Sequence, residues 1–316
     1  RPLPTSPRPE GPPLFRSPPR RRSAQSARRQ ADALPWGRAL AILSLFLLGV
    51  GLSACQRPAP GQASAWEQVR ARDVLIVGIK YDSPPFGFLD AEGVPRGFDA
   101  DLSRELAKRL LGSPRKASFR QVLSSTRLIA LKAGNVDMVA ATMTATPERA
   151  KAVRFSQPYH MARQAVLVRT DAGVRDLGGL VDKRVAFLLG STSGAGLKAA
   201  LPQAALVAAR DVGQAIRALR EERADAFTSD DVLLLSLVAG DCSLALLPER
   251  LGEEPYAVAF QPGPGSESLA RVVDGALQDM ARDGTLGRLR RKWIPADAPP
   301  DCRAAGEKTV PDAPGA

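Results

Sequence analysis

Between residues 73 and 293 the sequence alternates short apolar runs with amphipathic stretches of helical period, and this alternation constrains the fold more than any other feature. Residues 73–80 form a nearly continuous apolar run, which is typical of a strand covered on both faces. Residues 99–111 carry leucines four residues apart with charged residues between them, which predicts an amphipathic helix. Strand and helix units that alternate in this way predict an α/β fold with parallel sheets flanked by helices.

The same two periodicities predict further elements along the chain. We expect strands at residues 137–141, 165–169, 184–189, 205–208, 224–228 and 256–260. We expect helices at residues 125–133, 147–152, 194–201, 211–222, 231–239, 266–283 and 284–293. A chain of 316 residues is long enough for two α/β lobes, each with a hydrophobic core of its own.

The N-terminal segment differs in character from the rest of the chain. Residues 1–37 are rich in Pro and Arg and have no apolar periodicity, so we expect a disordered extension. Arg38 then precedes the mostly apolar residues 39–52. This segment is shorter than the roughly 20 residues that a membrane-spanning helix needs, and it has the length of a signal-peptide core.

The tripeptide Leu-Ser-Ala leads directly from this core into Cys55. The pattern resembles the lipobox of bacterial lipoproteins. It implies that residues 38–54 are a lipoprotein signal peptide, that Cys55 carries lipid after cleavage, and that residues 55–66 are the lipidated cysteine and a flexible tether. We therefore expect an extracytoplasmic protein anchored to the membrane by its N-terminus. A plain secretory signal, or an anchor helix with an incidental cysteine, remains the alternative.

The net charge of +11 does not indicate a nucleic-acid partner. Residues 1–54 hold nine arginines against two acidic residues, so they account for +7 and leave only +4 on the rest of the chain. A body with so small an excess lacks the basic surface that binds polyanions. One histidine and three cysteines exclude most histidine-based metal sites and multi-disulfide scaffolds. We expect no metal and no cofactor.

Seven short segments match one protein family in order and spacing. They are Gly78–Phe86, Gly97–Leu102, Ala141–Arg149, Phe155–Tyr159, Gly190–Ser193, Ser229–Asp230, and Asp283–Leu286 with Lys292–Trp293. In these segments the chain resembles the extracytoplasmic amino-acid-binding proteins of ABC importers, which are the bacterial extracellular solute-binding proteins of family 3. The resemblance covers about residues 73–294, most of the exported body.

This resemblance implies a two-lobed, type II periplasmic-binding-protein-like fold with a ligand cleft between the lobes. Two hinge crossings, near residues 159–163 and 254–258, would join the lobes. The implied parts are lobe 1 at residues 67–160 and 258–295, lobe 2 at residues 163–254, and a loose tail at residues 296–316. A ligand that contacts both lobes shifts the population toward the closed form, which a permease could recognise.

A free amino acid presents a carboxylate and an ammonium on one carbon, so its site needs a cation for one and a carboxylate for the other. Arg149 follows a helix start that Thr146 can cap, so its guanidinium is held on a defined element. The resemblance makes Arg149 the bidentate partner of the ligand α-carboxylate and Asp230 the acceptor of its ammonium. It also implies contacts to these α groups from Thr142, Thr144 and Thr192.

Two further cations indicate which kind of side chain the ligand carries. Lys80 ends the first strand, where ligands bind in open α/β sheets, and Arg127 precedes the second helix. A buried cation without a partner is destabilising, so a site that holds both favours a ligand with an additional negative charge. The chain resembles the acidic-amino-acid branch of the family, in which the counterparts of Lys80, Arg127 and Tyr256 contact a side-chain carboxylate. Glutamate or aspartate is the predicted ligand.

Other interpretations of these residues stay open. Lys80 and Arg127 could be exposed or paired with a protein carboxylate such as Asp82. Arg149 could be a solvated surface charge, and Asp230 could cap the helix that follows it.

Three remaining residues receive structural interpretations. Cys242 and Cys302 are candidates for a disulfide that ties the tail to lobe 2, because disulfides persist outside the cytoplasm; two free thiols are the alternative. His160, beside Tyr159, is interpreted as a structural residue of the hinge rather than as a base.

The predicted protein is a monomeric, lipid-anchored binding component that delivers an acidic amino acid to the permease of an ABC importer and is not an enzyme. One alternative is an enzyme on the same fold, similar to cyclohexadienyl dehydratase, which needs a general acid or base in the cleft. A second is a binding protein for a neutral or polar amino acid. A third is the sensory domain of a receptor, which would require a membrane span after residue 295.

Overall fold

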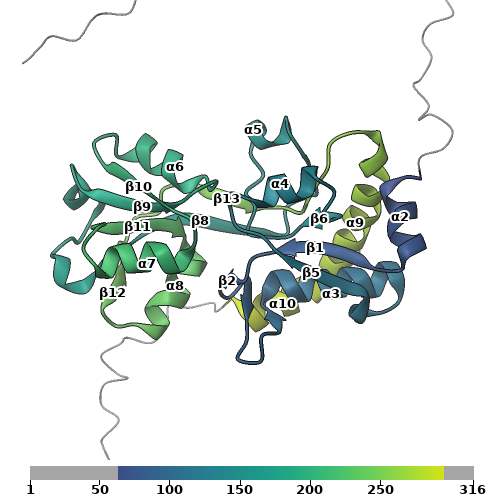
Figure 1. Cartoon of the computed structure of the whole chain (residues 1–316). Helices are drawn as coiled ribbons and strands as arrows, with labels where there is room; N and C mark the ends of the chain where they lie inside the picture. The colour runs from purple at the N-terminus through teal and green to yellow at the C-terminus, as the bar shows by residue number, and fades with distance from the viewer. Residues whose placement is uncertain (1–62, 295–316) are drawn as a thin grey trace, which may run out of the picture. The chain divides into compact units, whose positions relative to one another are not determined.

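The computed structural model of this protein describes residues 63–294 (Figure 1). The predicted N-terminal extension, signal peptide, Cys55, Cys302 and C-terminal tail lie outside the described residues. Among the helices that the structure describes, none is long and apolar enough to cross a membrane.

Lobe 1 is built on a five-stranded sheet. Across the sheet the strands are β5 (Ala117–Gln121), β1 (Leu75–Ile79), β6 (Met138–Val139), β14 (Ala259–Phe260) and β7 (Arg154–Phe155). Strand β1 runs parallel to β5 and β6, whereas β14 runs antiparallel to β6 and β7. The β1 side chains alternate between two hydrophobic clusters, with Val77 in one and Ile76 against the other. The predicted strand with both faces covered is therefore confirmed.

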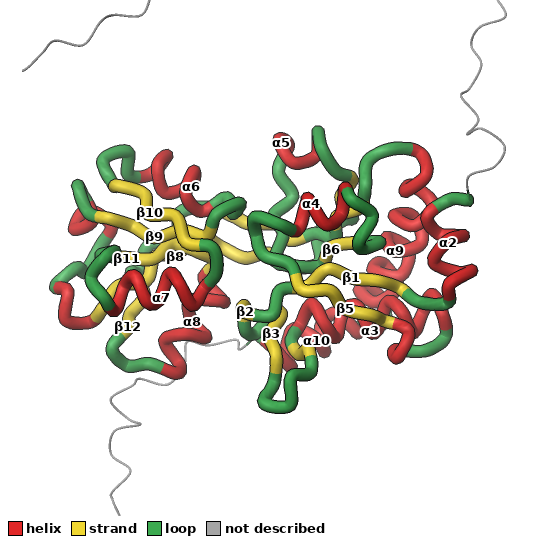
Figure 2. The backbone as a smooth tube through the Cα atoms, viewed as in Figure 1, coloured by secondary structure: helices red, strands yellow, loops and turns green. Residues whose placement is uncertain are grey.

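Helices cover both faces of this sheet (Figure 2). They are α2 (Ala65–Arg72), α3 (Phe98–Leu111), the 3₁₀ helix η1 (Pro114–Lys116), α4 (Arg127–Lys132), α5 (Pro147–Ala150), α9 (Pro264–Arg282) and α10 (Thr285–Trp293). In α3, Leu102 and Leu106 are fully buried in a cluster that also contains Leu269 and Leu277 of α9. Leu131 of α4 belongs to the cluster that contains Val139 of β6.

Lobe 2 is built on a mixed sheet. Its strands lie in the order β10 (Ala205–Ala209), β9 (Arg184–Leu188), β11 (Ala226–Asp230), β8 (His160–Arg169) and β12 (Leu244–Leu246), with β13 (Glu253–Tyr256) also paired to β8. Its helices are η2 (Thr170–Ala172), η3 (Leu177–Leu180), α6 (Ser193–Ala200), α7 (Val212–Arg220) and α8 (Asp231–Gly240). Strand β9 is parallel to β10 and β11, but β8 is antiparallel to β11, β12 and β13.

The predicted parallel pairing is therefore present in only part of each sheet, and the antiparallel pairs were not predicted. Strands β8 and β13 carry the chain into and out of lobe 2, and they pair antiparallel to each other because they run in opposite directions. The predicted strand at residues 256–260 is in fact two strands, β13 in the sheet of lobe 2 and β14 in the sheet of lobe 1. The two connections, from β7 to β8 and from β13 to β14, are the crossings of a two-lobed fold.

The chain start and one small sheet also differ from the sequence-based expectation. Helix α2 begins at Ala65, inside the predicted tether, because Ser64 and Glu67 form a reciprocal capping box. An unpredicted antiparallel sheet of β2 (Asp82–Ser83), β3 (Gly87–Leu89) and β4 (Pro95–Arg96) lies between β1 and α3. This small sheet brings the chain from β1 to the start of α3.

Candidate functional site

A small cavity of about 10 Å³ lies between the two lobes. It is lined by Lys80, Ser124, Arg127, Thr142, Thr144, Leu188, Ser191, Thr192, Ser193, Ser229 and Asp230. Six of the eight predicted ligand-binding residues are therefore brought together at one place. The cavity has room for about one water molecule, so the lobes are closed on one another and must part to admit an amino acid.

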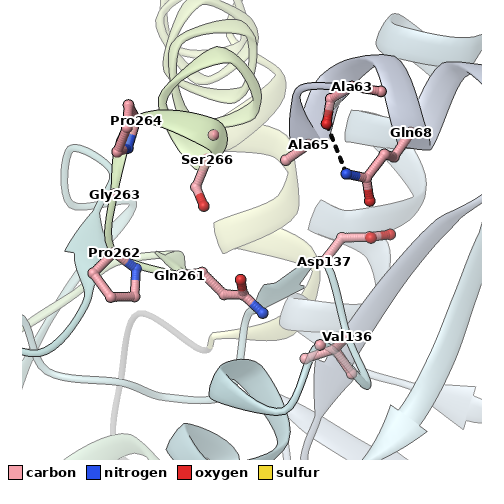
Figure 3. A pocket seen from close by; sticks show the side chains of 12 residues that line it. Ala63, Ala65, Gln68, Val136, Asp137, Gln261, Pro262, Gly263, Pro264 and Ser266 are labelled. Carbon is pink, nitrogen blue, oxygen red and sulfur yellow. Dashed lines mark hydrogen bonds between the residues drawn. The ribbon is translucent and has the colours of Figure 1, made fainter. Parts of the chain in front are cut away.

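A larger pocket of about 520 Å³ lies in lobe 1, beside the first turns of α2 and α9 (Figure 3). Its lining is mostly Ala, Gly and Pro, and the side-chain amides of Gln68 and Gln261 donate to the carbonyl oxygens of Ala63 and Leu131. No lysine or arginine lines it within the described residues. The smaller cavity between the lobes, which concentrates the charged groups, is the candidate site.

Lys80 follows β1 and is only 3% exposed. Its ammonium makes no hydrogen bond to any residue in the described range 63–294, and it lines the cavity. Burial, reinforced by the neighbouring charge of Arg127, lowers the pKa of Lys80 to about 8, against the opposing effect of Asp230. The exposed alternative for Lys80 is excluded, and its donors are free for a ligand.

Arg127 begins α4 and is 2% exposed. Its guanidinium donates to the carbonyl oxygens of Ala141 at 2.7 Å and Thr142 at 3.1 Å, and across the lobes to Gly190 at 3.4 Å. Burial and the charge of Arg149 lower the pKa of Arg127 to about 9. Because backbone oxygens occupy three of its five N–H donors, Arg127 is less available to a ligand carboxylate than the sequence suggested.

Arg149 lies in the single turn of α5, which Thr146 caps by accepting a hydrogen bond from the Arg149 backbone N–H. The Arg149 guanidinium donates to Thr144 O and, across the lobes, to Gly190 O, both at 2.9 Å. Burial lowers the pKa of Arg149, while Glu254 and Asp230 oppose that shift. The predicted capped position is confirmed, and the side chain bridges the lobes at the edge of the cavity.

Asp230 ends β11 and occupies the N-cap position of α8, but its side chain makes no capping hydrogen bond. The alternative that it merely caps this helix is therefore excluded. Burial raises the pKa of Asp230 to about 6, against the lowering effect of Lys80. Opposite it, Thr142 adopts a left-handed backbone with φ of 45° and has a buried hydroxyl without a partner in the described chain. Strain of this kind in a β-branched residue is typical of functional sites.

Tyr256 and His160 form an aromatic wall behind the cavity. Tyr256 is fully buried with its ring 5.3 Å from Phe86 and 5.6 Å from His160. Burial, followed by the interaction of its hydroxyl with the Asp230 carboxylate, raises the pKa of Tyr256. Burial, followed by the charge of Arg290, lowers the pKa of His160 to about 4. His160 is thus a neutral packing residue near pH 7, in agreement with the structural interpretation.

Two buried carboxylates near the site were not singled out from the sequence. Asp99 of α3 is fully buried and accepts hydrogen bonds from the Tyr159 hydroxyl at 2.8 Å and the Thr142 N–H at 3.1 Å. Glu254 of β13 is 6% exposed and accepts from the hydroxyls of Thr144 and Thr192. Asp99 falls within the segment Gly97–Leu102 that carries the family resemblance, whereas Glu254 lies two residues before Tyr256, outside the seven segments.

These two carboxylates overturn the predicted excess of positive charge. The buried or half-buried cations are Lys80, Arg127 and Arg149, and the carboxylates whose charges act on them are Asp82, Asp99, Asp230 and Glu254. Four carboxylates thus face three cations, so no excess of positive charge is left for a second ligand carboxylate. A zwitterion with an uncharged side chain adds no net charge to this set. A ligand with a second carboxylate on its side chain would add a negative charge that no cation compensates.

The model of the bacterial extracellular solute-binding proteins, family 3, matches residues 75–296. The chain belongs to this family. The predicted family and its two-lobed fold are thereby confirmed, and the extracellular location that the family name states agrees with the predicted export.

Individual relatives of this family member extend the comparison. The ABC transporter glutamine-binding protein GlnH of Bacillus subtilis (strain 168) is 32% identical over 267 residues, which cover 82% of this chain and 97% of that protein. The glutamine-binding protein of Geobacillus stearothermophilus is 36% identical over 194 residues, which cover 61% and 74%. Both are named for glutamine, so neither supports the predicted membership of the acidic branch.

A solved structure agrees in fold. The solute receptor for L-cysteine of Neisseria gonorrhoeae has a TM-score of 0.69 and 30% identity, and the match covers 79% of this chain and 98% of that one. All three proteins are named as binding proteins or receptors rather than as enzymes.

Among the described residues there is no group of three or more His, Cys, Asp or Glu side chains that could hold a metal ion. Cys242 lies in the turn after α8, but Cys302 lies outside the described part of the chain, so their pairing stays a prediction.

Proposed function

We propose that this family member is the binding component of an ABC importer for a neutral, polar amino acid, with glutamine as the first candidate. The observation that carries the proposal is that the carboxylates around the cavity already match the charge of the three cations there. A zwitterion with an uncharged side chain preserves this balance. The names of the two glutamine-binding relatives support the same choice.

In this proposal each polar group of the ligand has one main partner. The ammonium binds the Asp230 carboxylate and the α-carboxylate binds Arg149, which can present a planar pair of donors. The side-chain amide oxygen accepts from the Lys80 ammonium, which lines the cavity and has no partner of its own among the described residues. An amide suits Lys80 because a neutral acceptor satisfies the ammonium without adding charge.

Hinge closure then connects binding with transport. Arg149 and Thr144 belong to lobe 1, while Thr192 and Asp230 belong to lobe 2. A ligand touches all of them only when the lobes are closed, so binding shifts the population toward the closed form. We infer that a membrane permease recognises this closed form and receives the amino acid.

Thermal unfolding of the purified protein with each of the twenty amino acids tests the proposal. Glutamine at a hundredfold excess over its Kd should raise Tm by about 5 °C or more. Lys80→Met should remove this shift, whereas Lys132→Met, at an exposed position on α4, should retain it. Stabilisation by glutamate or aspartate alone, or by no amino acid, would reject the proposal. Conversion of the ligand during incubation would favour the enzyme alternative.

We also infer that the mature protein is anchored by lipid on Cys55, which the Leu-Ser-Ala-Cys pattern supports. In bacteria that export the full chain, the wild type should appear in the membrane fraction. Cys55→Ser should abolish lipid labelling and release the protein from that fraction. Equal membrane association of the two forms would contradict lipid anchoring.

A further inference from the structure

Glu254 lies on the hinge strand β13, between the two lobes. Its backbone pairs with Ala162 of β8, and its carboxylate is buried between the lobes. Thr192 of lobe 2 donates its hydroxyl hydrogen to this carboxylate at 2.9 Å, and Thr144 of lobe 1 donates to the same group. One hinge carboxylate therefore holds a hydroxyl from each lobe.

The number of hydrogens that Glu254, Thr144 and Thr192 can donate determines which of these groups donate and which accept. A threonine hydroxyl has one hydrogen to donate, and an ionised carboxylate has none. Both hydroxyl hydrogens of the Thr144–Thr192 pair are therefore directed to Glu254. The two hydroxyl oxygens lie 3.4 Å apart, and both residues line the cavity, so their lone pairs remain for a ligand.

We propose that Glu254 is a positioning and specificity-determining residue that makes the Thr144–Thr192 pair an acceptor for a donor group of the ligand. The inference rests on the proposed function and extends it by naming the ligand group that the Thr144–Thr192 pair binds. The Asp230 carboxylate lines the same cavity. The two hydroxyl oxygens and this carboxylate together form an acceptor set for the ligand ammonium.

This assignment differs from one in which the two hydroxyls donate to the α-carboxylate. Such donation would need hydrogens that Glu254 already takes. Arg149 keeps the role of binding the carboxylate, since its guanidinium has donors and no acceptors. Glu254 does not line the cavity. By accepting both hydroxyl hydrogens, it makes the Thr144–Thr192 pair suited to the ligand ammonium and unsuited to the ligand carboxylate.

Calorimetry of the wild type and two variants, each with two ligands, tests the proposal. The ligands are the amino acid that binds tightest, which we expect to be glutamine, and its des-amino analogue, which lacks the ammonium. Glu254→Gln supplies an amide N–H to the pair, so one hydroxyl can turn away, and the acceptor set is weakened. We expect about tenfold weaker binding of the amino acid and less than about threefold change for the analogue.

The matched control is Glu253→Gln, which removes the same charge from the exposed neighbouring residue of β13. It should bind both ligands as the wild type does. Equal losses for both ligands in Glu254→Gln would indicate a merely structural role and would overturn the inference. If the wild type binds no amino acid, the proposed function fails and the inference fails with it.

A double-mutant cycle tests, without any ligand, whether the Thr192 hydroxyl donates to Glu254. Thr192→Val should lower the Tm of the wild type but should lower that of Glu254→Gln less, because the donated hydrogen bond is already weakened there. Additive Tm changes would contradict donation by Thr192 to Glu254.

Discussion

At the scale of single residues, Asp230 determines how binding should respond to pH. Its pKa is raised to about 6 by burial, and only its ionised form attracts an ammonium. Affinity should therefore fall as the pH drops through 6, by about tenfold between pH 7 and pH 5. The single histidine cannot produce this profile, because burial holds the pKa of His160 near 4, whereas Asp99, whose pKa burial also raises to about 6, titrates in the same range. Calorimetric Kd values across this range measure the effect, and a flat profile would contradict the role of Asp230.

Arg149 offers a second test at this scale. Its planar guanidinium donates to Thr144 O and Gly190 O, and in the proposed function its remaining donors bind the ligand carboxylate. Lysine keeps the charge but cannot hold this geometry, so Arg149→Lys should weaken amino-acid binding by about 30-fold or more. Arg154→Lys, at a nearby partly exposed position, serves as the control. Unchanged affinity in Arg149→Lys would exclude bidentate recognition at this residue.

The sequence predicted most of the site residues because local motifs carry them, but it did not predict the charge balance. Asp99 is held by Tyr159, 60 residues away, and Glu254 by Thr144, 110 residues away. Contacts over such separations leave no local pattern in one sequence. The expected acidic ligand followed from the visible cations, and the carboxylates that balance them became apparent only in the folded chain.

At the scale of elements, the junction of β4 with α3 depends on Gly97. Its φ is 113°, and a Cβ atom there would lie 2.2 Å from the carbonyl oxygen of Phe86. Gly97→Ala should therefore destabilise the protein by about 3 kcal/mol or more in urea unfolding. Gly265→Ala, on α9 with nothing within 4 Å of the added methyl, should be neutral or slightly stabilising. Similar stabilities for the two variants would show that the junction tolerates a side chain.

Long elements were predictable and short ones were not. Helix α3 was expected at residues 99–111 and spans 98–111, since an apolar stripe over several turns defines both its face and its length. Strands β2 and β4 have two residues each, too few to establish a period. The antiparallel strands β8 and β13 were not foreseen as such, because strand direction depends on how the chain crosses between the lobes.

At the scale of the whole described chain, contacts remote from the cavity help to hold the lobes together. The Ser236 hydroxyl of α8 shares its one hydrogen between Pro84 O of lobe 1 at 2.8 Å and Leu233 O of its own helix at 2.6 Å, and the Val212 N–H donates to Asp82 across the same boundary. Ser236→Ala should weaken amino-acid binding by about threefold by disfavouring the closed form. Ser243→Ala, exposed within lobe 2, should leave the Kd unchanged. Equal Kd values for both variants would mean that this contact does not stabilise closure.

The most direct measurement is a calorimetric comparison of glutamine with glutamate on the wild-type protein at pH 7.5. The two ligands have nearly the same shape and differ by one charge on the side chain. Because carboxylates of the protein already match the charge of the three cations, glutamine should bind at least about tenfold more tightly than glutamate. Tighter binding of glutamate would contradict the balanced site and restore the acidic ligand.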